Sequence, residues 1–408
     1  MILTNHFYPE DFRVNDVAFE LAKRNYDITV ITAIPDYPNG KYFDGYSIFK
    51  KRREKIHGVN VIRLFIIPRG QGSPLRLTLN YLSYLISSLL FVFFHSFQAK
   101  YDVVLVHMTS PFFITLPGVY LKRYKGVPLI LWILDLWPES VAAAGGVTNR
   151  RILCALDLMV KNVYKHSDKI LVGSDTFKTS ISKKGDFAKK LIYFPNWADS
   201  ISSVSIGEAY KLVEPFHSKT PFDFIFLFAG NLGEAQNIDF LLQVIASIKV
   251  DSRVKFVFMG DGRKRVPLMN KAHSLGLTEI CFFPGRFPQS SMPYFISRAD
   301  VMVVSLKNDP IFSLTVPAKV QFYMSQGKPI LAILDGEGAR IIQECQCGIV
   351  VSPSDTQGFQ LAISQFLGLS KNQLLELGDN GRRYYTEHFA KEKRIDQIES
   401  LLRSLVKA

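Results

Sequence analysis

The sequence predicts an α/β fold of two doubly wound domains that face each other across a cleft. Apolar strands alternate with amphipathic helices along the chain, which is typical of parallel sheets covered by helices on both faces. The chain has 408 residues, too many for one core, so two domains of about 200 residues are expected. The alternation stops at Pro195–Asp199 and in the Ser-rich, charged sequence up to about Pro221, and it then starts again.

Short runs of β-branched and other apolar residues predict the strands of the first half. These runs are 1–5, 28–32, 59–65, 102–106, 129–134, 169–173 and 191–194. The helical spacing of Val14, Val17 and Leu21 predicts a helix over 12–24. Further helices are expected over 77–97, up to about 123, over 151–165 and over 176–183. Because the first strand begins at Met1, we expect no signal peptide ahead of the fold.

The second half repeats the pattern. Its predicted strands are 224–228, 255–259, 280–283, 301–304, 330–333 and 348–351, with helices between them. The end, from about residue 371, is helical with a break near His388. We therefore expect an N-terminal domain over 1–197, a C-terminal domain over 198–385, and a last helix over 386–408 that packs back on the N-terminal domain. Ligands of such sheets bind beyond the carboxyl ends of the strands, so the residues after each strand are the site candidates.

Composition narrows the function. With 48% hydrophobic and 21% charged residues the chain is globular, and its net charge of +13 suits nucleic acid, an anionic membrane or phosphorylated substrates. No zinc-finger spacing or RNP-like strand occurs, so nucleic acid is not expected. The basic run Lys50–Lys55 is interpreted either as a solvated loop or as a lipid-headgroup patch.

The cysteines do not form a disulfide framework in a chain of this length. They are Cys154, Cys281, Cys345 and Cys347. The last two are spaced C-x-C with no second pair nearby, so a metal site is not favoured there. Reduced thiols and a cytoplasmic location are expected.

One apolar segment lacks charged residues between Arg76 and Lys100 and is long enough to span a bilayer. A membrane span, an interfacial helix and a packed helix are the alternatives. A polar stripe on one helical face argues for a helix that lies on something rather than one that crosses lipid. The stripe consists of Asn80, Ser83, Ser87 and Ser88.

The strongest candidate site lies in the second half. Lys319 opens a predicted helix, where a cation is poorly placed against the helix dipole unless an anionic ligand offsets the cost. The Gly336–Gly338 loop opens the next helix, and exposed N–H groups there suit a phosphate. Together they predict a nucleotide-diphosphate site, although simple solvent exposure of Lys319 is the alternative. Glu337 and Glu344 are candidates for sugar hydroxyls. Other donor candidates near strand ends and in these helices are Gly230, Asn231, Arg286, Gln321, Ala339 and Arg340.

Polar residues also follow the strands of the first half. Arg13, Asn15 and Asp16 cannot all cap the same helix, so at least one is a site residue or part of an ion pair. His107 and Ser110 follow the fourth parallel strand, and Asp135 and Glu139 follow the fifth. A carboxylate at a strand end is well placed to orient a hydroxyl or act as a base, and structural pairing with Lys or Arg is the alternative.

The motifs at these strand ends, read in order, resemble a known family. They are FYPEDFRVND, IPDYPNGKYFDGY, HMTSP, DLWPES, PNWAD, AGNLGEAQNI, GDGRK, VPAKVQFYMSQGKPI and DGEGA, from residue 7 to about 339. Together they resemble family 4 retaining glycosyltransferases of the GT-B fold, with two Rossmann-like domains. The resemblance points in particular to the bacterial O-antigen and capsule subgroup that includes N-acetyl-L-fucosamine transferases.

The resemblance implies a UDP-sugar donor in the C-terminal domain and a polyprenyl-diphosphate-linked saccharide acceptor in the N-terminal domain. It implies transfer with retention, without a metal or cofactor, by a peripheral protein on the inner face of the cytoplasmic membrane. The donor sugar would be an N-acetylated deoxyhexosamine. Lys319 and helix-terminal N–H groups would assist departure of the diphosphate, and Asp135 would orient the acceptor or the sugar.

The sequence departs from the family pattern at several points. The family's two glutamates near the donor ribose correspond to Leu314 and Phe322, and its Arg and Lys after the first strand of the second domain correspond to Asn231 and Gln236. Its Gly-Gly loop corresponds to Phe12–Asp16. Lys319, Arg286 and the Gly-Glu-Gly loop then remain as phosphate contacts, with Glu344 or Gln321 as ribose partners. A sugar-nucleotide epimerase of the same fold and a catalytically inactive sugar-nucleotide-binding protein are the rival functions.

Overall fold

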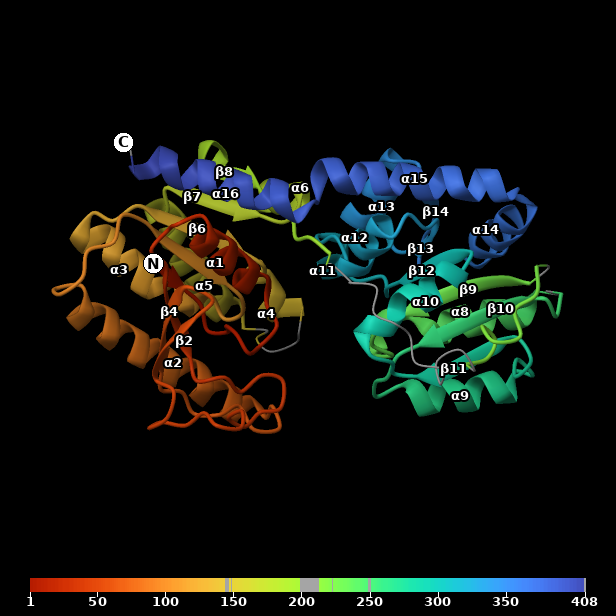
Figure 1. Ribbon diagram of the computed structural model, residues 1–408, viewed down its shortest axis with the longest axis horizontal. Coiled ribbons are helices and arrows are strands. Elements are labelled where there is room, and N and C mark those ends of the chain that lie inside the picture. The colour runs from red at the N-terminus through yellow and green to blue at the C-terminus, as the bar shows by residue number, and fades with distance from the viewer. Residues whose placement is uncertain (144–146, 148, 199–212, 222, 249–250, 407–408) are drawn as a thin grey trace. The chain divides into compact units, whose positions relative to one another are not determined.

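The computed structural model describes residues 1–143, 147, 149–198, 213–221, 223–248 and 251–406 (Figure 1). The chain divides into two compact units. Unit 1 consists of Met1–Pro195 and Glu392–Ala408, and unit 2 of Asn196–Lys391. Residues 199–212, which open the expected second domain, lie outside the described residues.

Unit 1 is built on one sheet, whose described strands lie in the order β3-β4-β2-β1-β5-β6-β7-β8. Every neighbouring pair is parallel except β3 and β4. The central strands are buried throughout because helices cover both faces, as their continuous apolar sequences predict. The strands are β1 (Ile2–Leu3), β2 (Thr29–Ala33), β3 (Arg53–Ile56), β4 (Val59–Leu64), β5 (Val104–Met108), β6 (Leu129–Ile133), β7 (Lys169–Val172) and β8 (Leu191–Tyr193).

The helices of unit 1 come from both ends of the chain. They are α1 (Arg13–Lys23), α2 (Pro74–His95), η1 (Phe112–Thr115), α3 (Leu116–Lys125), α4 (Glu139–Ala143), α5 (Arg150–His166), α6 (Asp175–Ser182), η2 (Ala188–Lys190) and α16 (Lys391–Val406). The last helix, α16, lies beside β8, where Gln397 donates a hydrogen bond of 3.0 Å to the carbonyl of Tyr193 (Figure 1). It also pairs with the end of α1, since Arg24 lies 2.6 Å from Asp396.

The basic run at Lys50–Lys55 differs from its prediction as a solvated loop. Residues Arg53–Ile56 form β3, an antiparallel strand at the sheet edge. Charged side chains on an edge strand discourage pairing with other chains. Apolar content did not reveal this strand because three of its four residues are charged, and only its pairing with β4 defines it.

Unit 2 carries a second sheet, all parallel within the described residues, in the order β11-β10-β9-β12-β13-β14. Its strands are β9 (Phe224–Ala229), β10 (Val254–Met259), β11 (Cys281–Gly285), β12 (Val301–Ser305), β13 (Ile330–Ile333) and β14 (Gly348–Val351). Its helices are η3 (Glu234–Gln236), α8 (Ile238–Ser247), α9 (Arg265–Ser274), η4 (Gln289–Ser291), α10 (Met292–Arg298), α11 (Pro310–Ser313), α12 (Ala318–Ser325), α13 (Glu337–Glu344), α14 (Thr356–Gly368) and α15 (Lys371–His388).

The core of unit 2 is rich in phenylalanine on one face of this sheet. Phe226 of β9 stacks on Phe256 of β10 at 4.9 Å between ring centroids. Leu241 of α8 and Phe359 of α14 join the same buried cluster. Aromatic burial of this size is the main stabilising contribution of the unit. The predicted α/β fold of two doubly wound units is confirmed in both.

Gly118 of α3 provides a test of how closely helix and sheet pack. A Cβ atom there would lie 2.6 Å from Cγ2 of Val106 on β5 and 3.0 Å from Cδ1 of Leu129 on β6. We expect Gly118→Ala to lower the free energy of unfolding by about 1–3 kcal/mol through overpacking. Gly368→Ala at the end of α14, where a Cβ would meet nothing within 4 Å, is the matched control. Urea unfolding of both variants measures the difference, and equal stabilities would contradict the packing.

Candidate functional site

Lys319 lies in the first turn of α12 and reaches the end of β9. Its ammonium is 3.8 Å from the centroid of the Phe228 ring and donates a hydrogen bond of 2.5 Å to Oε1 of Gln236. Within the described residues no carboxylate pairs with it. Burial lowers the pKa of the Lys319 amine to about 7. The amine is therefore held at the carboxyl edge of the sheet without a compensating negative charge.

The backbone around Lys319 is open because glycines end the neighbouring strands. Gly230 follows β9 with φ of +147°, and a Cβ there would lie 2.5 Å from Cε of Lys319. Gly260 follows β10, and a Cβ there would lie 1.8 Å from the carbonyl oxygen of Gly230. Side chains at either position would displace Lys319 or the adjoining strand end. A ligand can approach this edge closely.

The start of α13 lies at the same edge, after β13. Gly336 has φ of +79°, and a Cβ there would lie 2.1 Å from the carbonyl oxygen of Ser313. Glu337 is 3% exposed and forms an ion pair of 2.8 Å with Arg340, which also pairs with Glu344 at 2.5 Å. Glu337 and Glu344, both candidates for sugar hydroxyls, are thus joined through one guanidinium. Gly338 and Ala339 are buried in the first turn.

The remaining donor candidates divide between the surface and the interior. Arg286 is exposed in the loop that follows β11. Asn231 follows β9 and is exposed. Its side-chain amide packs against Gly262, since a Cβ atom at Gly262 would lie 2.6 Å from Oδ1 of Asn231. Gln321 is 2% exposed on α12. Their roles toward a ligand stay predictions.

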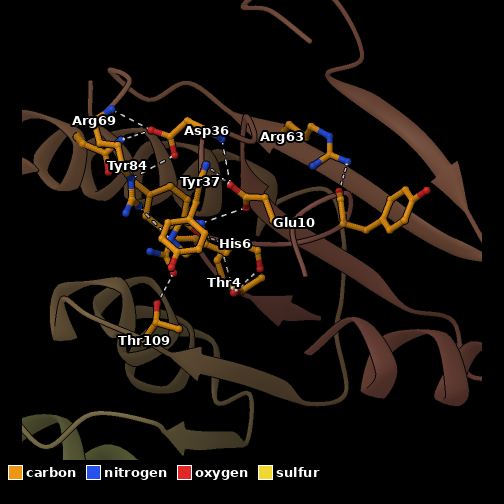
Figure 2. Close-up of polar contacts among 12 residues, drawn as sticks. Thr4, His6, Glu10, Asp36, Tyr37, Arg63, Arg69, Tyr84 and Thr109 are labelled. Atoms are coloured by element: carbon orange, nitrogen blue, oxygen red, sulfur yellow. Dashed lines mark hydrogen bonds and ion pairs between the residues drawn. The ribbon is translucent and has the colours of Figure 1, made fainter. Parts of the chain in front are cut away.

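Unit 1 contains a buried polar network that sequence reasoning did not select (Figure 2). Glu10 accepts hydrogen bonds from the backbone N–H groups of Asp36 (3.0 Å) and Tyr37 (2.7 Å). Its other oxygen lies 3.0 Å from Nδ1 of His6. Nε2 of His6 lies 3.1 Å from the guanidinium of Arg69, which donates. His6 is therefore a neutral tautomer with its proton on Nδ1. The signal was the i, i+4 spacing of His6 and Glu10 directly after a strand.

Asp36 connects this network to α2. It accepts hydrogen bonds from the backbone N–H of Arg69 (2.9 Å) and from the side-chain amide of Asn80 (3.2 Å). Burial raises the pKa of the Asp36 carboxyl, and Arg69 opposes that shift. The loops after β1, β2 and β4 are thereby fixed to one another and to the helix. We call His6, Glu10, Asp36, Arg69 and Asn80 the polar brace.

Three of these groups lie close enough to hold a metal ion. Ligand atoms of His6, Glu10 and Asp36 lie within 4.8 Å of one another. However, Arg69 supplies a positive charge at 3.6 Å from Asp36, and backbone or side-chain N–H groups occupy the carboxylates. The donor set is already satisfied, so the geometry fits a structural network better than a cation site.

His107 ends β5 beside the brace and is buried. The Thr4 hydroxyl donates its one proton to the carbonyl of His6 at 2.9 Å. Toward His107 the same oxygen must therefore act as the acceptor, and Nδ1 of His107 donates to it at 3.1 Å. Nε2 of His107 then carries a lone pair and has no hydrogen-bond partner among the described residues. Burial and the neighbouring His6 lower the pKa of His107 to about 3, so the ring stays neutral and Nε2 is an acceptor.

Ser110 and Asp135 meet beyond the ends of the neighbouring strands β5 and β6. Ser110 donates a hydrogen bond of 2.8 Å to Oδ2 of Asp135 and accepts one of 3.2 Å from the indole of Trp137. Asp135 is partly exposed, and its other carboxylate oxygen has no protein donor among the described residues. This pair can orient a hydroxyl group of a substrate.

Other first-half candidates make contacts within unit 1. Glu139 forms an ion pair of 2.7 Å with Lys184, which is the structural alternative for that carboxylate. Asn15 is buried, donates to the carbonyl of Glu10 at 2.7 Å and accepts from the backbone N–H of Tyr8 at 3.1 Å. Arg13 and Asp16 lie in the first turns of α1, half-buried.

Comparisons with known proteins bear on the family and the fold of the chain. Residues 214–384, within unit 2, match the family model described as Glycosyl transferases group 1. The chain is 24% identical over 318 residues to WbjE of Pseudomonas aeruginosa, assigned as a glycosyltransferase. The aligned residues cover 76% of this chain and 76% of WbjE. It is 23% identical over 368 residues to WcaI of Escherichia coli, assigned as a glycosyl transferase of colanic acid biosynthesis, covering 86% of this chain and 87% of WcaI.

A solved structure of similar fold is Anabaena Alr3699/HepE in complex with UDP and glucose. It superposes with a TM-score of 0.65 at 15% identity and covers 99% of this chain and 98% of HepE. The sheet order, the parallel strands and these matches lead to one conclusion. Unit 2 carries a domain of the Glycosyl transferases group 1 family, and the chain is a glycosyltransferase with the GT-B fold.

Proposed function

We propose that this chain is a retaining glycosyltransferase that moves a sugar, an N-acetylated deoxyhexosamine, from a UDP-sugar to a lipid-linked saccharide in bacterial surface polysaccharide biosynthesis. One observation carries the proposal: the Lys319 amine lies at a glycine-lined strand edge with no carboxylate partner in the described part of the chain. A diphosphate supplies the missing charge. The UDP bound by HepE and the colanic acid role assigned to WcaI support it.

The proposed mechanism uses few side chains. Binding of the diphosphate favours the ammonium form of Lys319, which stabilises the charge that develops as the sugar–phosphate bond breaks. N–H groups at the start of α13 add to this stabilisation. The acceptor hydroxyl attacks the anomeric carbon from the face that the diphosphate leaves, and a diphosphate oxygen takes its proton, so configuration is retained. Asp135, held by Ser110, orients the acceptor or the sugar. These groups make transfer without a metal the simplest expectation.

Incubation with a UDP-sugar and a lipid-linked saccharide tests the function, and Lys319→Met tests its centre. Product on the acceptor is expected, and Lys319→Met should lower kcat/KM by a factor of about 10²–10³ because a charge at the leaving group is lost. Lys271→Met is the matched control, since that half-buried lysine already pairs with Asp239 at 3.2 Å. Sugar isomerised without acceptor would instead indicate an epimerase, and UDP-sugar binding without turnover an inactive binding protein.

UDP binding should depend on pH through Lys319. The free amine has a pKa of about 7, and the complex needs the charged form, so binding above that pH takes up a proton. Below pH 7 the Lys319 amine is already charged and does not change the affinity for UDP. From about pH 7 to about pH 9 the affinity for UDP falls by up to about tenfold per pH unit. Calorimetry in buffers of different ionisation enthalpy measures both the affinity and the proton uptake. Lys319→Met should abolish the slope, and a flat wild-type profile would contradict the assignment.

The helix α2 supports a location at the membrane. By length and composition it is long and apolar enough to cross one. Its polar side chains, however, face unit 1: Asn80 belongs to the polar brace, Tyr84 donates to the carbonyl of Thr4 at 2.7 Å, and Ser87 donates to that of Phe65 at 2.8 Å. The opposite face is apolar and exposed, at spacings of three, four and one. It consists of Leu75, Leu79, Leu82, Ile86, Leu90, Phe93 and Phe94.

A rim of aromatic and basic residues borders this face. Phe93 lies 6.0 Å from Tyr120 of α3, and Lys125 lies 4.1 Å from the ring of Phe97. Tyr124 and Arg123 in the last turn of α3 are exposed. Aromatic and cationic side chains beside an apolar stripe suit the headgroup region of an anionic bilayer. We therefore propose that α2 lies in the interface of the inner face of the cytoplasmic membrane, and that the protein is peripheral and cytoplasmic.

Replacing Leu90, Phe93 and Phe94 with Ser should release the protein from vesicles of phosphatidylglycerol and phosphatidylethanolamine. Each side chain is expected to contribute about tenfold to partitioning, because burial of a large apolar group is favourable by roughly 1.5–3 kcal/mol. Leu361, Leu367 and Leu375, exposed in unit 2, provide the matched triple-Ser control. Co-sedimentation measures the bound fraction. Unchanged binding of the α2 variant would rule out the interfacial helix.

A further inference from the structure

A hollow lies in unit 1, formed by the loops after β1 and β2 together with β3. Its volume is about 640 Å³, within the range of small-molecule sites. Aromatic side chains form much of its lining, and exposed polar groups stand among them. The residues that matter here are Tyr8, Tyr42, Tyr46, Lys41, Lys51 and Asp44. We call this space the aromatic hollow.

A buried arginine supports the aromatic hollow. Arg63 of β4 is 1% exposed, and its guanidinium carbon lies 4.8 Å from the centroid of the Tyr46 ring. It donates to Glu54 at 2.7 Å and to the carbonyl of Tyr8 at 2.7 Å. Its Nη1 is buried and has no hydrogen-bond partner among the described residues. These contacts hold Arg63 against the Tyr46 ring and the loop after β1, and so fix the position of that ring.

Two exposed lysines line the aromatic hollow. Neither Lys41 nor Lys51 pairs with a carboxylate in the described ranges, and the ammonium of Lys51 lies 4.7 Å from the ring of Tyr46. Glu54, which also lines the hollow, already forms an ion pair with Arg63. Asp44 is exposed and remains available as an acceptor for hydroxyl groups. Phosphate is the natural partner of two unpaired ammonium groups.

The polar brace fixes one wall of the aromatic hollow. Glu10 binds the N–H groups of Asp36 and Tyr37 at the start of the loop after β2, and Gly40 donates to the carbonyl of Asp36 at 2.7 Å. The backbone N–H of Phe43 donates to the carbonyl of Pro35 at 3.1 Å. The loop is thus closed on itself and tied to the strand ends. Such a wall is preorganised for a ligand rather than formed by one.

We propose that the aromatic hollow is the acceptor site. A saccharide ring packs against Tyr8 and Tyr46, its hydroxyls reach Asp44, and the phosphate that joins it to the lipid binds Lys41 and Lys51. Aromatic faces bind the apolar face of a sugar ring, and paired ammonium groups bind the phosphate, so the two features together select a phosphorylated saccharide over either part alone. This inference rests on the proposed function, in which the acceptor is a lipid-linked saccharide.

Saturation-transfer NMR on the full chain tests the inference with N-acetylglucosamine 1-phosphate as the probe. Saturating UDP is present, so that the probe cannot occupy the donor site. We expect saturation of the sugar-ring protons in the wild type, with at least about fivefold less for N-acetylglucosamine and no displacement of the probe by equimolar inorganic phosphate. Tyr8→Leu and Lys51→Gln should each weaken the signal at least about threefold, whereas Tyr46→Phe, which keeps the ring, should preserve it.

The matched control is Lys50→Gln, an exposed neighbour of Lys51 that does not line the hollow. In turnover assays Tyr8→Leu and Lys51→Gln should raise KM for the lipid-linked saccharide about tenfold and leave KM for the UDP-sugar unchanged. Absence of probe saturation with UDP bound, or equal signals in these variants and the wild type, would overturn the site. So would loss of vesicle binding in Lys51→Gln with an unchanged probe signal, because the lysine would then contact lipid headgroups. Failure to bind UDP at all would refute the proposed function itself.

Discussion

The proposed chemistry depends on one buried amine, that of Lys319, which has no carboxylate partner in the described part of the chain. The Lys319 amine rests against the ring of Phe228 and the amide of Gln236, and both contacts are electrically neutral groups. Removing an ammonium from water without a counter-ion is unfavourable, which is why its pKa falls to about 7. A diphosphate reverses that penalty, and the reversal is largest when the leaving group carries its full charge. In the proposed reaction, the energetic cost of holding this unpaired ammonium is thus converted into stabilisation of the departing nucleotide.

The relation between Lys319 and Gln236 also bears on whether the chain is active. The resembling family carries a lysine where this chain has Gln236, and its loss taken alone favours an inactive binding protein. In the folded chain the Lys319 ammonium lies 2.5 Å from the Gln236 side chain, so a cation is present at that place from another helix. The family's two glutamates, which correspond to Leu314 and Phe322 here, are not replaced in the same way. The chain does carry two other glutamates on α13, Glu337 and Glu344, which both pair with Arg340.

Sequence patterns predicted what is local and repetitive, and they failed where partners are distant in the chain. The buried strands β2, β5, β6, β9, β12 and β13 follow from runs of apolar residues. The contact between Ser110 and Asp135 was not predicted, because it depends on the order of the strands in the sheet. The charged strand β3 was missed because only its pairing with β4 defines it. The brace was missed for the same reason: Glu10 meets Asp36, and Asp36 meets Asn80, across separations that no spacing rule covers.

The helix α2 connects the two roles proposed for unit 1, which are membrane contact and acceptor binding. An ordinary surface helix hides its apolar face, whereas α2 hides its polar face, because Asn80 and Tyr84 satisfy carboxylate and carbonyl groups of the brace region that would otherwise be buried unpaired. The apolar stripe is left outside as a consequence, and a bilayer is the solvent that suits it. The brace that orients this helix also holds the loop of Tyr42 and Tyr46. The apolar face proposed to meet lipid and the hollow proposed to receive a lipid-linked saccharide are therefore held by the same buried hydrogen bonds. Under these proposals, membrane docking and acceptor binding would share one rigid support.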